Sequence, residues 1–136
     1  MRVQNPGRSC SAPTPAHFRA WVRAAAAGPV EVTVRLVGTA EGRRLNLAYR
    51  AKDSATNVLA FAYAPGLGDI VLCPAVIARE AREQGKTLER HYAHLTVHAI
   101  LHLRGYDHVR RADAARMERA EIRILKALGH PNPYLA

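Results

Sequence analysis

The chain has 136 residues, of which 49% are hydrophobic, so it is long enough for one compact domain (residues 1–136) and too short for two. Its 20 basic and 11 acidic side chains give a net charge of +9, which favours nucleic acid as partner. The chain has no apolar run of about eighteen residues, so a membrane span is not expected. It has no apolar segment near its start, so a secretory signal is not expected either. A cytoplasmic protein is therefore predicted.

The arginine content leaves open an alternative to a nucleic-acid-binding face, and the cysteine content argues against two kinds of structure. Most of the basic residues are arginine and alanine is abundant, so codon bias is the alternative to a binding face. Cys10 and Cys73 lie far apart and outside any C-x-x-C pattern, so neither a disulfide framework nor a thiolate zinc site is predicted.

The first elements are predicted from caps and periodicity. RVQN near the start suggests a short edge strand, and Thr14 followed by Pro15 is a typical helix start. The helix that follows ends at Gly28–Pro29 and places Phe18, Trp21, Val22 and Ala25 on one face, which we expect to be core. Residues 30–37 (VEVTVRLV) alternate apolar and polar side chains and predict a half-buried strand.

The middle of the chain contains one segment that periodicity cannot assign. Residues 41–54 (EGRRLNLAYRAKDS) fit a strand through Leu45, Leu47 and Tyr49 and equally fit a short amphipathic helix. The apolar runs 57–63 and 68–73 predict two paired strands joined by a tight turn around Gly66.

Three helices are predicted in the second half. The first covers residues 74–85 and ends at Gly85. The second is capped by Thr87, covers 88–103 and ends near Gly105, and its apolar side chains lie most of the way round, as in a central buried helix. The third covers about 113–128, and HPNPYLA follows as a tail.

The stretch HAILHLRGYDH, which begins at His98, carries the strongest chemical signal. His98 and His102 are four residues apart on the predicted helix, so both imidazoles point the same way. Gly105 allows the chain to turn back and bring His108 to the same point. Three imidazoles with one open coordination position are typical of catalytic zinc, so these three histidines are the predicted metal ligands.

Several alternatives stay open around this motif. The histidines could be core residues instead, and nickel or copper could occupy the same nitrogens. His91 and His94 could line the site, hydrogen-bond to a ligand or be polar surface. Asp107 could orient an imidazole or an arginine, or satisfy backbone groups of the turn.

The spacing also matches the metzincin metalloprotease frame, in which a glutamate follows the first histidine. Here that position is Ala99, so the general base of a peptidase is missing. Met117 lies in a helical pattern with Ile124 and Leu128 and is interpreted as core rather than as a Met-turn. A metal site in a basic protein without this carboxylate favours a phosphodiester substrate, with an arginine to offset charge on the phosphate.

HAILHLRGYDH resembles the H-G-x-L-H-L-x-G-Y-D-H signature of the YbeY family of bacterial endoribonucleases and rRNA maturation factors. LNLAYRAKDSATNVLAF, LGDIVLC and HPNPY resemble other family segments in the same order, so that the match covers residues 45–134. The family usually has glycine where Ala99 stands, and Pro, Ser and Pro where Ala55, Ala60 and Ala62 stand.

The resemblance implies a single α/β (α+β) domain, with a small mixed sheet of about four strands packed with helices around the metal helix, and a helix over residues 41–50. It implies one zinc ion on His98, His102 and His108, with Arg50 facing the cleft and contacting RNA phosphate as a catalytic residue. The implied activity is single-strand-specific cleavage of ribosomal RNA, at the 3′ end of the 16S rRNA of the small ribosomal subunit, together with ribosome quality control. Ribosomal RNA, and not DNA or a membrane, is the implied partner, with ribosome-associated proteins as further partners.

Two other functions are weighed against this one. In the first, the protein is a non-catalytic ribosome-assembly factor that binds RNA through its positive charge and contains a structural zinc ion. In the second, it is a zinc peptidase, an interpretation that rests only on the metzincin-like spacing.

Overall fold

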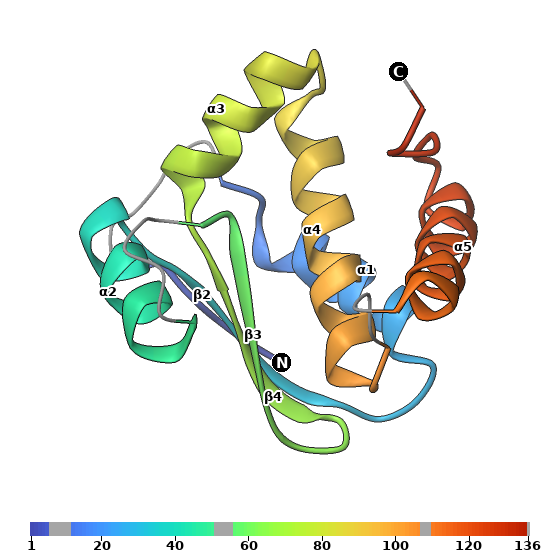
Figure 1. Cartoon of the computed structure of the whole chain (residues 1–136), viewed down its shortest axis with the longest axis horizontal. Helices are drawn as coiled ribbons and strands as arrows, with labels where there is room; N and C mark the ends of the chain where they lie inside the picture. Colours follow the sequence, from blue (N-terminus) through green and yellow to red (C-terminus); the bar gives the residue numbers. More distant parts are fainter. Residues whose placement is uncertain (6–11, 51–55, 107–109, 136) are drawn as a thin grey trace.

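A four-stranded mixed sheet forms the centre of the fold in the computed structural model, which describes residues 1–5, 12–50, 56–106 and 110–135 (Figure 1). The strand order across the sheet is β1 (Arg2–Gln4), β2 (Glu31–Leu36), β4 (Leu67–Leu72), β3 (Val58–Ala64). Strands β1, β2 and β4 run parallel, and β3 pairs with β4 in the antiparallel direction, which leaves β3 at one edge.

Alternation of side chains along β2 gives the sheet two different faces. Val32, Val34 and Leu36 are buried on one face, whereas Thr33 and Arg35 are half-buried on the other. Successive side chains of a strand point to opposite faces, so this pattern is the expected consequence of the sequence. The strand predicted from residues 30–37 and the paired strands predicted after it are confirmed.

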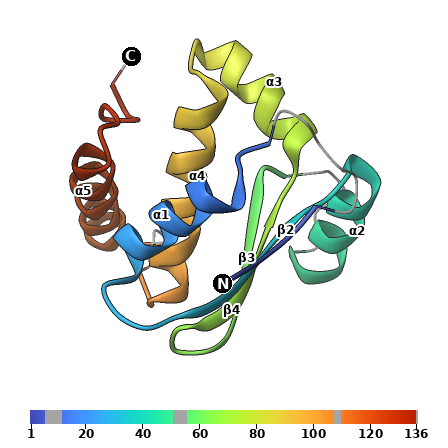
Figure 2. The same ribbon diagram turned by 180° about the vertical axis from the view of Figure 1, so that it is seen from behind.

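Helices cover the two faces of the sheet unequally (Figures 1 and 2). On one side lie α1 (Pro15–Ala26), α4 (Leu88–Leu103) and α5 (Arg111–Ala127), and on the other lies α2 (Thr39–Arg50). The remaining described helix, α3 (Pro74–Gln84), lies beyond one end of the strands and leads into α4. The expected α/β domain with a small mixed sheet is confirmed.

Helix α4 lies at the centre of the main core. Phe18, Tyr92, Ile100 and Met117 are each at most 1% exposed and belong to the same buried cluster. Each apolar side chain of this size stabilises the fold by about 1.5–3 kcal/mol when it is fully buried. The interpretation of Met117 as a core residue is confirmed.

Residues 41–50 of the ambiguous segment belong to helix α2, as the family resemblance implied, and residues 51–54 lie outside the described part of the chain. A strand would have placed Leu45, Leu47 and Tyr49 on one face, but of these three only Leu45 packs against the buried cluster on this side of the sheet. Leu47 is 50% exposed and Tyr49 is 67% exposed, whereas Leu45 is half-buried, so the helical spacing separates Leu45 from the other two.

Three details differ from the sequence expectations or complete them. Helix α5 begins at Arg111, two residues earlier than expected. Cys73 is a buried free thiol, whereas Cys10 lies outside the described residues. Within the described part of the chain, no helix has both the length and the apolarity that a membrane crossing requires.

At Gly68 the sheet comes close to α4. A β-carbon at this position would lie 2.4 Å from the carbonyl oxygen of Phe61 and 2.8 Å from Cδ2 of Leu103. We therefore expect Gly68→Ala to lower the free energy of unfolding by about 1–3 kcal/mol, the usual cost of overpacking, measured by urea denaturation.

Gly28→Ala is the matched control for this substitution. The added methyl group meets nothing within 4 Å, and Gly28 does not have a left-handed backbone. Its unfolding midpoint should stay close to that of the wild-type chain. Equal midpoints for both variants would show that β4 and α4 tolerate a wider separation.

Candidate metal and nucleic-acid cleft

A cleft of about 350 Å³ lies between the edge strand β3 and helix α4. Its β3 side is made by Val58 to Phe61, and its α4 side by His98, Ala99 and His102. Tyr49, from the last turn of α2, also lines it. The cleft thus joins the helix that carries two of the predicted ligands to the helix that ends at Arg50.

The two predicted ligands on α4 lie one helical turn apart and face the same cleft. The ring centroids of His98 and His102 are 6.4 Å apart, and the ring planes are nearly parallel. His98 is partly exposed, with 30% of its side chain accessible, and His102 is exposed. The structure therefore brings these two imidazoles together, as the four-residue spacing predicts.

After α4 the chain reverses direction at Gly105. Its backbone is left-handed, with φ of +95°, and the amide of Tyr106 donates to the carbonyl oxygen of Leu101 at 3.0 Å. This geometry favours glycine, because a β-carbon is strained in it. The turn that the sequence required of Gly105 is present.

The third predicted ligand, His108, and its neighbour Asp107 lie outside the described residues. The residues described on either side of this gap contain no group of three or more His, Cys, Asp or Glu side chains placed to hold a metal ion. The three-histidine site therefore stays a prediction, to which the structure contributes the placement of His98 and His102.

A buried carboxylate behind the cleft determines how His98 is oriented. Glu121, on α5, is fully buried, and its Oε1 lies 2.5 Å from Nδ1 of His98. Its other oxygen accepts from Nε2 of His94 at 3.1 Å and from the hydroxyl of Tyr134. Three side chains from α4 and the C-terminal segment thus converge on one carboxylate.

The charge state of Glu121 follows from these contacts. Burial alone would raise its pKa, but hydrogen bonds from His94, His98 and Tyr134 outweigh burial and lower the pKa to about 2. An ionised carboxylate only accepts hydrogen bonds, so Nδ1 of His98 carries the hydrogen. In the neutral ring Nε2 is then the nitrogen with a lone pair, and this arrangement suits a metal-binding histidine supported by a carboxylate.

His94 supports Glu121 and does not line the cleft. Only 14% of its side chain is exposed, and its Nδ1 is buried without a hydrogen-bond partner. Its ring meets that of Tyr134 edge-on, with centroids 5.3 Å apart. Of the roles left open for His94, hydrogen bonding behind the predicted ligands is the one that its contacts support.

His91 belongs to a separate network. It is 3% exposed, and its Nε2 lies 2.9 Å from Oε1 of Glu80, which also accepts from Nδ2 of Asn57 at 3.0 Å. Burial lowers the pKa of His91 despite this partner. These contacts tie α3 and α4 to the segment that leads into β3, so His91 is a structural residue rather than a lining of the cleft.

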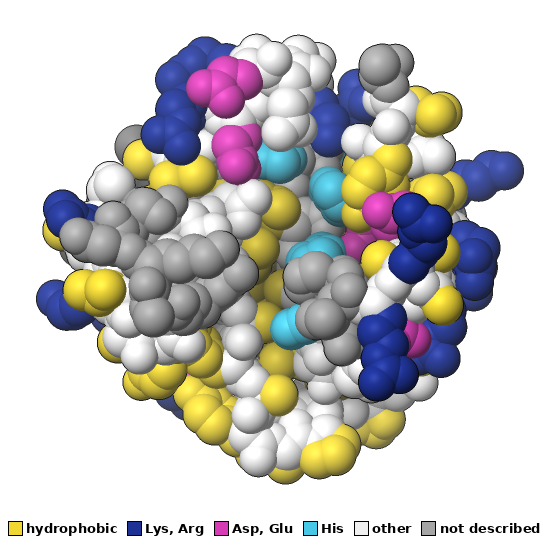
Figure 3. All heavy atoms as spheres, in the orientation of Figure 1, with side chains coloured by type: hydrophobic (Ala, Val, Ile, Leu, Met, Phe, Trp, Pro, Cys, Tyr) yellow, Lys and Arg dark blue, Asp and Glu magenta, His cyan; other side chains and the backbone are white. Residues whose placement is uncertain are grey.

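The surface around the cleft carries charges of both signs. Figure 3 shows histidine side chains gathered along a hollow, with Lys, Arg, Asp and Glu side chains around it. Arg50 is the last residue of α2 and follows Tyr49 of the cleft, but its side chain is outside the described part of the structure. The expectation that Arg50 faces the cleft therefore stays untested.

Sequence reasoning missed Glu121 and Tyr134. The available signal was a glutamate on the apolar stripe of α5, four residues after Met117 and three before Ile124. A charged side chain at such a position is rarely buried unless it is paired. For Tyr134, no periodic pattern marked the tail residue that returns to this glutamate.

Comparisons with known proteins agree with the motifs. Residues 14–129 match the model of the family described as endoribonuclease YbeY. A protein of that name from Aromatoleum aromaticum is 57% identical over 135 residues, which cover 97% of this chain and 86% of that protein. One from Nitrosomonas eutropha is 51% identical, with 99% and 98% of the two chains covered.

One solved structure shares the fold. A solution structure of a protein from Thermotoga maritima superposes with a TM-score of 0.60 at 24% sequence identity. The similarity covers 99% of each chain. It shows that the arrangement of sheet and helices is common to both proteins.

Proposed function

Because this chain belongs to the YbeY family, we propose that it is a zinc-dependent endoribonuclease that cleaves single-stranded RNA. The observation that carries this proposal is the pair His98 and His102 in a cleft of a strongly basic protein, with a buried carboxylate on Nδ1 of His98. The relatives at 50–57% identity are themselves named endoribonucleases.

His98, His102 and His108 are the residues that would hold zinc. The described donors fit this ion, because imidazole nitrogens suit zinc and the carboxylate of Glu121 fixes the hydrogen of His98 on Nδ1. Zinc bound there supplies Lewis acidity for the hydrolysis of a phosphodiester. Glu121, in turn, is kept ionised by His94 and Tyr134, so that it continues to orient His98.

Arg50 is proposed to contact the phosphate at the cleft. Its guanidinium is always charged and can donate two parallel hydrogen bonds to phosphate oxygens, which offsets the charge that develops there. The neighbouring Tyr49 and the apolar strand residues of the cleft fit an unpaired nucleotide. A duplex buries its bases and presents its backbone, which favours a single strand as substrate.

The proposed biological substrate is ribosomal RNA of the small subunit, processed at the 3′ end of the 16S rRNA, with a role in ribosome quality control. The family resemblance supports this assignment. The net charge of +9 supports it too, because a basic surface attracts a polyanion through counterion release.

A cleavage assay tests the proposal. The purified, zinc-loaded chain should cut single-stranded RNA internally, leave duplex RNA largely intact and lose activity with a chelator. RNA binding without cleavage under any metal would instead favour the non-catalytic assembly factor. Digestion of an unstructured polypeptide would favour the peptidase. Either result would overturn the proposed activity.

Substitution of Glu121 separates its effect on zinc from its effect on the fold. Glu121→Gln keeps the shape of the side chain but removes the charge that fixes the hydrogen of His98 on Nδ1. We expect zinc affinity to fall by about 10–100-fold, the range typical of partners behind metal ligands, in competition with a chromophoric chelator.

Glu118→Gln is the matched control, because Glu118 is an exposed glutamate on the same helix. It should bind zinc as tightly as the wild-type chain. Equal zinc affinities for all three proteins would show that the contact between Glu121 and His98 only stabilises the fold.

A further inference from the structure

Part of the sheet face on the α2 side is not covered by that helix. A second hollow of about 350 Å³ lies there. The residues that line it come from all four strands and from α2: Gln4, Thr33, Arg35, Leu45, Tyr49, Phe61, Tyr63, Asp69 and Val71. The hollow therefore combines aromatic rings with polar side chains and with one charged side chain of each sign, Arg35 and Asp69.

Two exposed aromatic rings in this hollow, those of Tyr63 and Tyr49, are held in place by neighbouring side chains. Tyr63 is 66% exposed, and its hydroxyl donates to Oδ2 of Asp69 at 2.6 Å, which restrains the ring. Tyr49 is 67% exposed and meets Phe61 edge-on, with ring centroids 4.8 Å apart. Exposed, restrained rings on a sheet are suited to stacking with flat ligands.

The second hollow adjoins the histidine cleft. Tyr49 and Phe61 line both hollows, so a strand that passes over these two rings can reach from His98 and His102 to Tyr63. A flexible single strand can follow a path that changes direction at an edge strand. A rigid duplex with stacked bases has no unpaired ring to offer these side chains.

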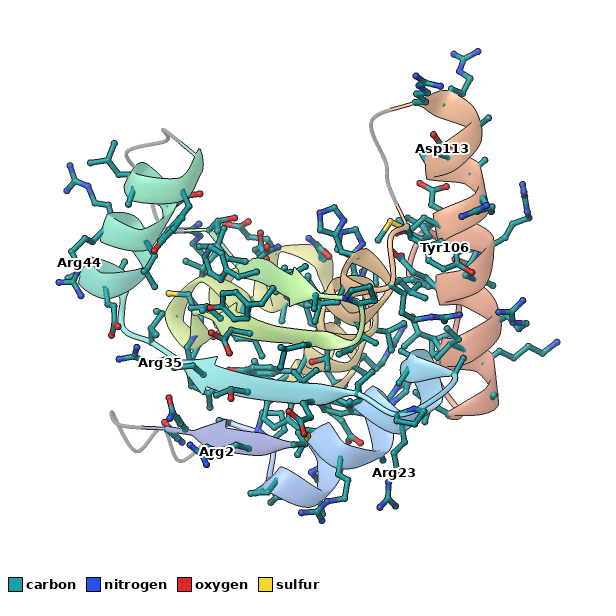
Figure 4. The ribbon with its side chains drawn as sticks, turned by 90° about the horizontal axis from the view of Figure 1, so that it is seen from below. Arg2, Arg23, Arg35, Arg44, Tyr106 and Asp113 are labelled. Carbon is teal, nitrogen blue, oxygen red and sulfur yellow. The ribbon has the colours of Figure 1, made fainter. Side chains whose placement is uncertain are left out.

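One basic side chain, that of Arg35, lines the second hollow. It is 42% exposed and pairs with Glu41 of α2 at 2.8 Å. Arg44 of the same helix lies on the outside of α2 and points away from the sheet (Figure 4). Aromatic rings beside basic side chains form the usual combination for single-stranded nucleic acid.

We propose that this open sheet hollow binds unpaired bases of the RNA strand that flank the cleaved bond, by stacking on Tyr63 and on the Tyr49–Phe61 pair. The inference rests on the proposed endoribonuclease function and adds a second binding subsite to it. Tyr63 lines the second hollow but not the histidine cleft, so its substitution separates the two sites.

The test compares RNA strands of two lengths. The affinity of the zinc-loaded full chain for fluorescein-labelled single strands of about four and about twelve nucleotides is measured by anisotropy within seconds of mixing. Tyr63→Ala should weaken binding of the longer strand by about tenfold and change binding of the shorter strand by less than about twofold. Tyr63→Phe, which keeps the ring, should restore the affinity.

Leu47→Ala is the matched control, because Leu47 is an exposed apolar residue of α2 outside both hollows. It should bind both strands like the wild-type chain. If Tyr63→Ala binds the longer strand as tightly as the wild-type chain does, the RNA subsite is disproved. Binding of a protein partner is then the remaining interpretation of this sheet face. If the wild-type chain binds neither strand, the proposed function fails together with the subsite.

Discussion

His102→Ala is expected to abolish RNA cleavage and to lower zinc affinity by more than about a hundredfold, which exceeds the usual effect of losing a residue behind the ligands. Its imidazole is one of only three predicted ligands. His102 is exposed, so its removal leaves the core intact and the variant should fold like the wild-type chain. Zinc content by elemental analysis and cleavage of single-stranded RNA are the two measurements.

His102 is a better position for this experiment than His98. Substitution of His98 would leave the buried Glu121 with one donor fewer, at a cost of about 1–3 kcal/mol in stability, so folding and metal binding would change together. His17→Ala removes an exposed histidine of α1 and should keep full zinc content and activity. Normal cleavage by His102→Ala would remove this residue from the site.

Arg50→Ala is expected to reduce cleavage of single-stranded RNA by about 10²–10³-fold at unchanged zinc content, the usual effect of losing one donor that stabilises transition-state charge. Arg50→Lys keeps the charge but not the two parallel donors, so its rate should lie between those of the wild-type chain and Arg50→Ala. Single-turnover rates at saturating RNA measure this effect separately from binding.

Arg44→Ala is the control for Arg50, because it removes an arginine of the same helix that points away from the sheet (Figure 4). Only a small decrease in RNA affinity is expected, from one lost positive charge. If Arg50→Ala and Arg44→Ala reduce the rate equally and slightly, Arg50 belongs to the general basic surface and has no catalytic role.

Most of the fold could be predicted from local signals. The cap at Thr87 and the glycine at position 105 correctly predicted the bounds of α4. Alternation of apolar and polar side chains predicted β2. Helix α2 could not be assigned by periodicity, because Leu45, Leu47 and Tyr49 alternate as in a strand. The tertiary structure decided it, since a single leucine of this segment meets the sheet.

The site could be predicted only where sequence neighbours determine it. His98 and His102 are neighbours on one helix, and their common face follows from the helical repeat. Glu121 and Tyr134 reach them from α5 and from the C-terminal segment, and the packing of distant elements leaves little trace in local sequence. The second hollow could not be predicted from local sequence either, because its aromatic residues lie on α2 and β3, which only the folded chain brings together.

The most direct test of the central claim is X-ray absorption spectroscopy at the zinc edge of the zinc-loaded protein. The account predicts one zinc ion per chain with three imidazole nitrogens at about 2.0–2.1 Å and one further ligand that does not come from the protein. His102→Ala should lose one imidazole from this set. Four protein ligands on the ion, or an imidazole count that does not change in His102→Ala, would contradict the account.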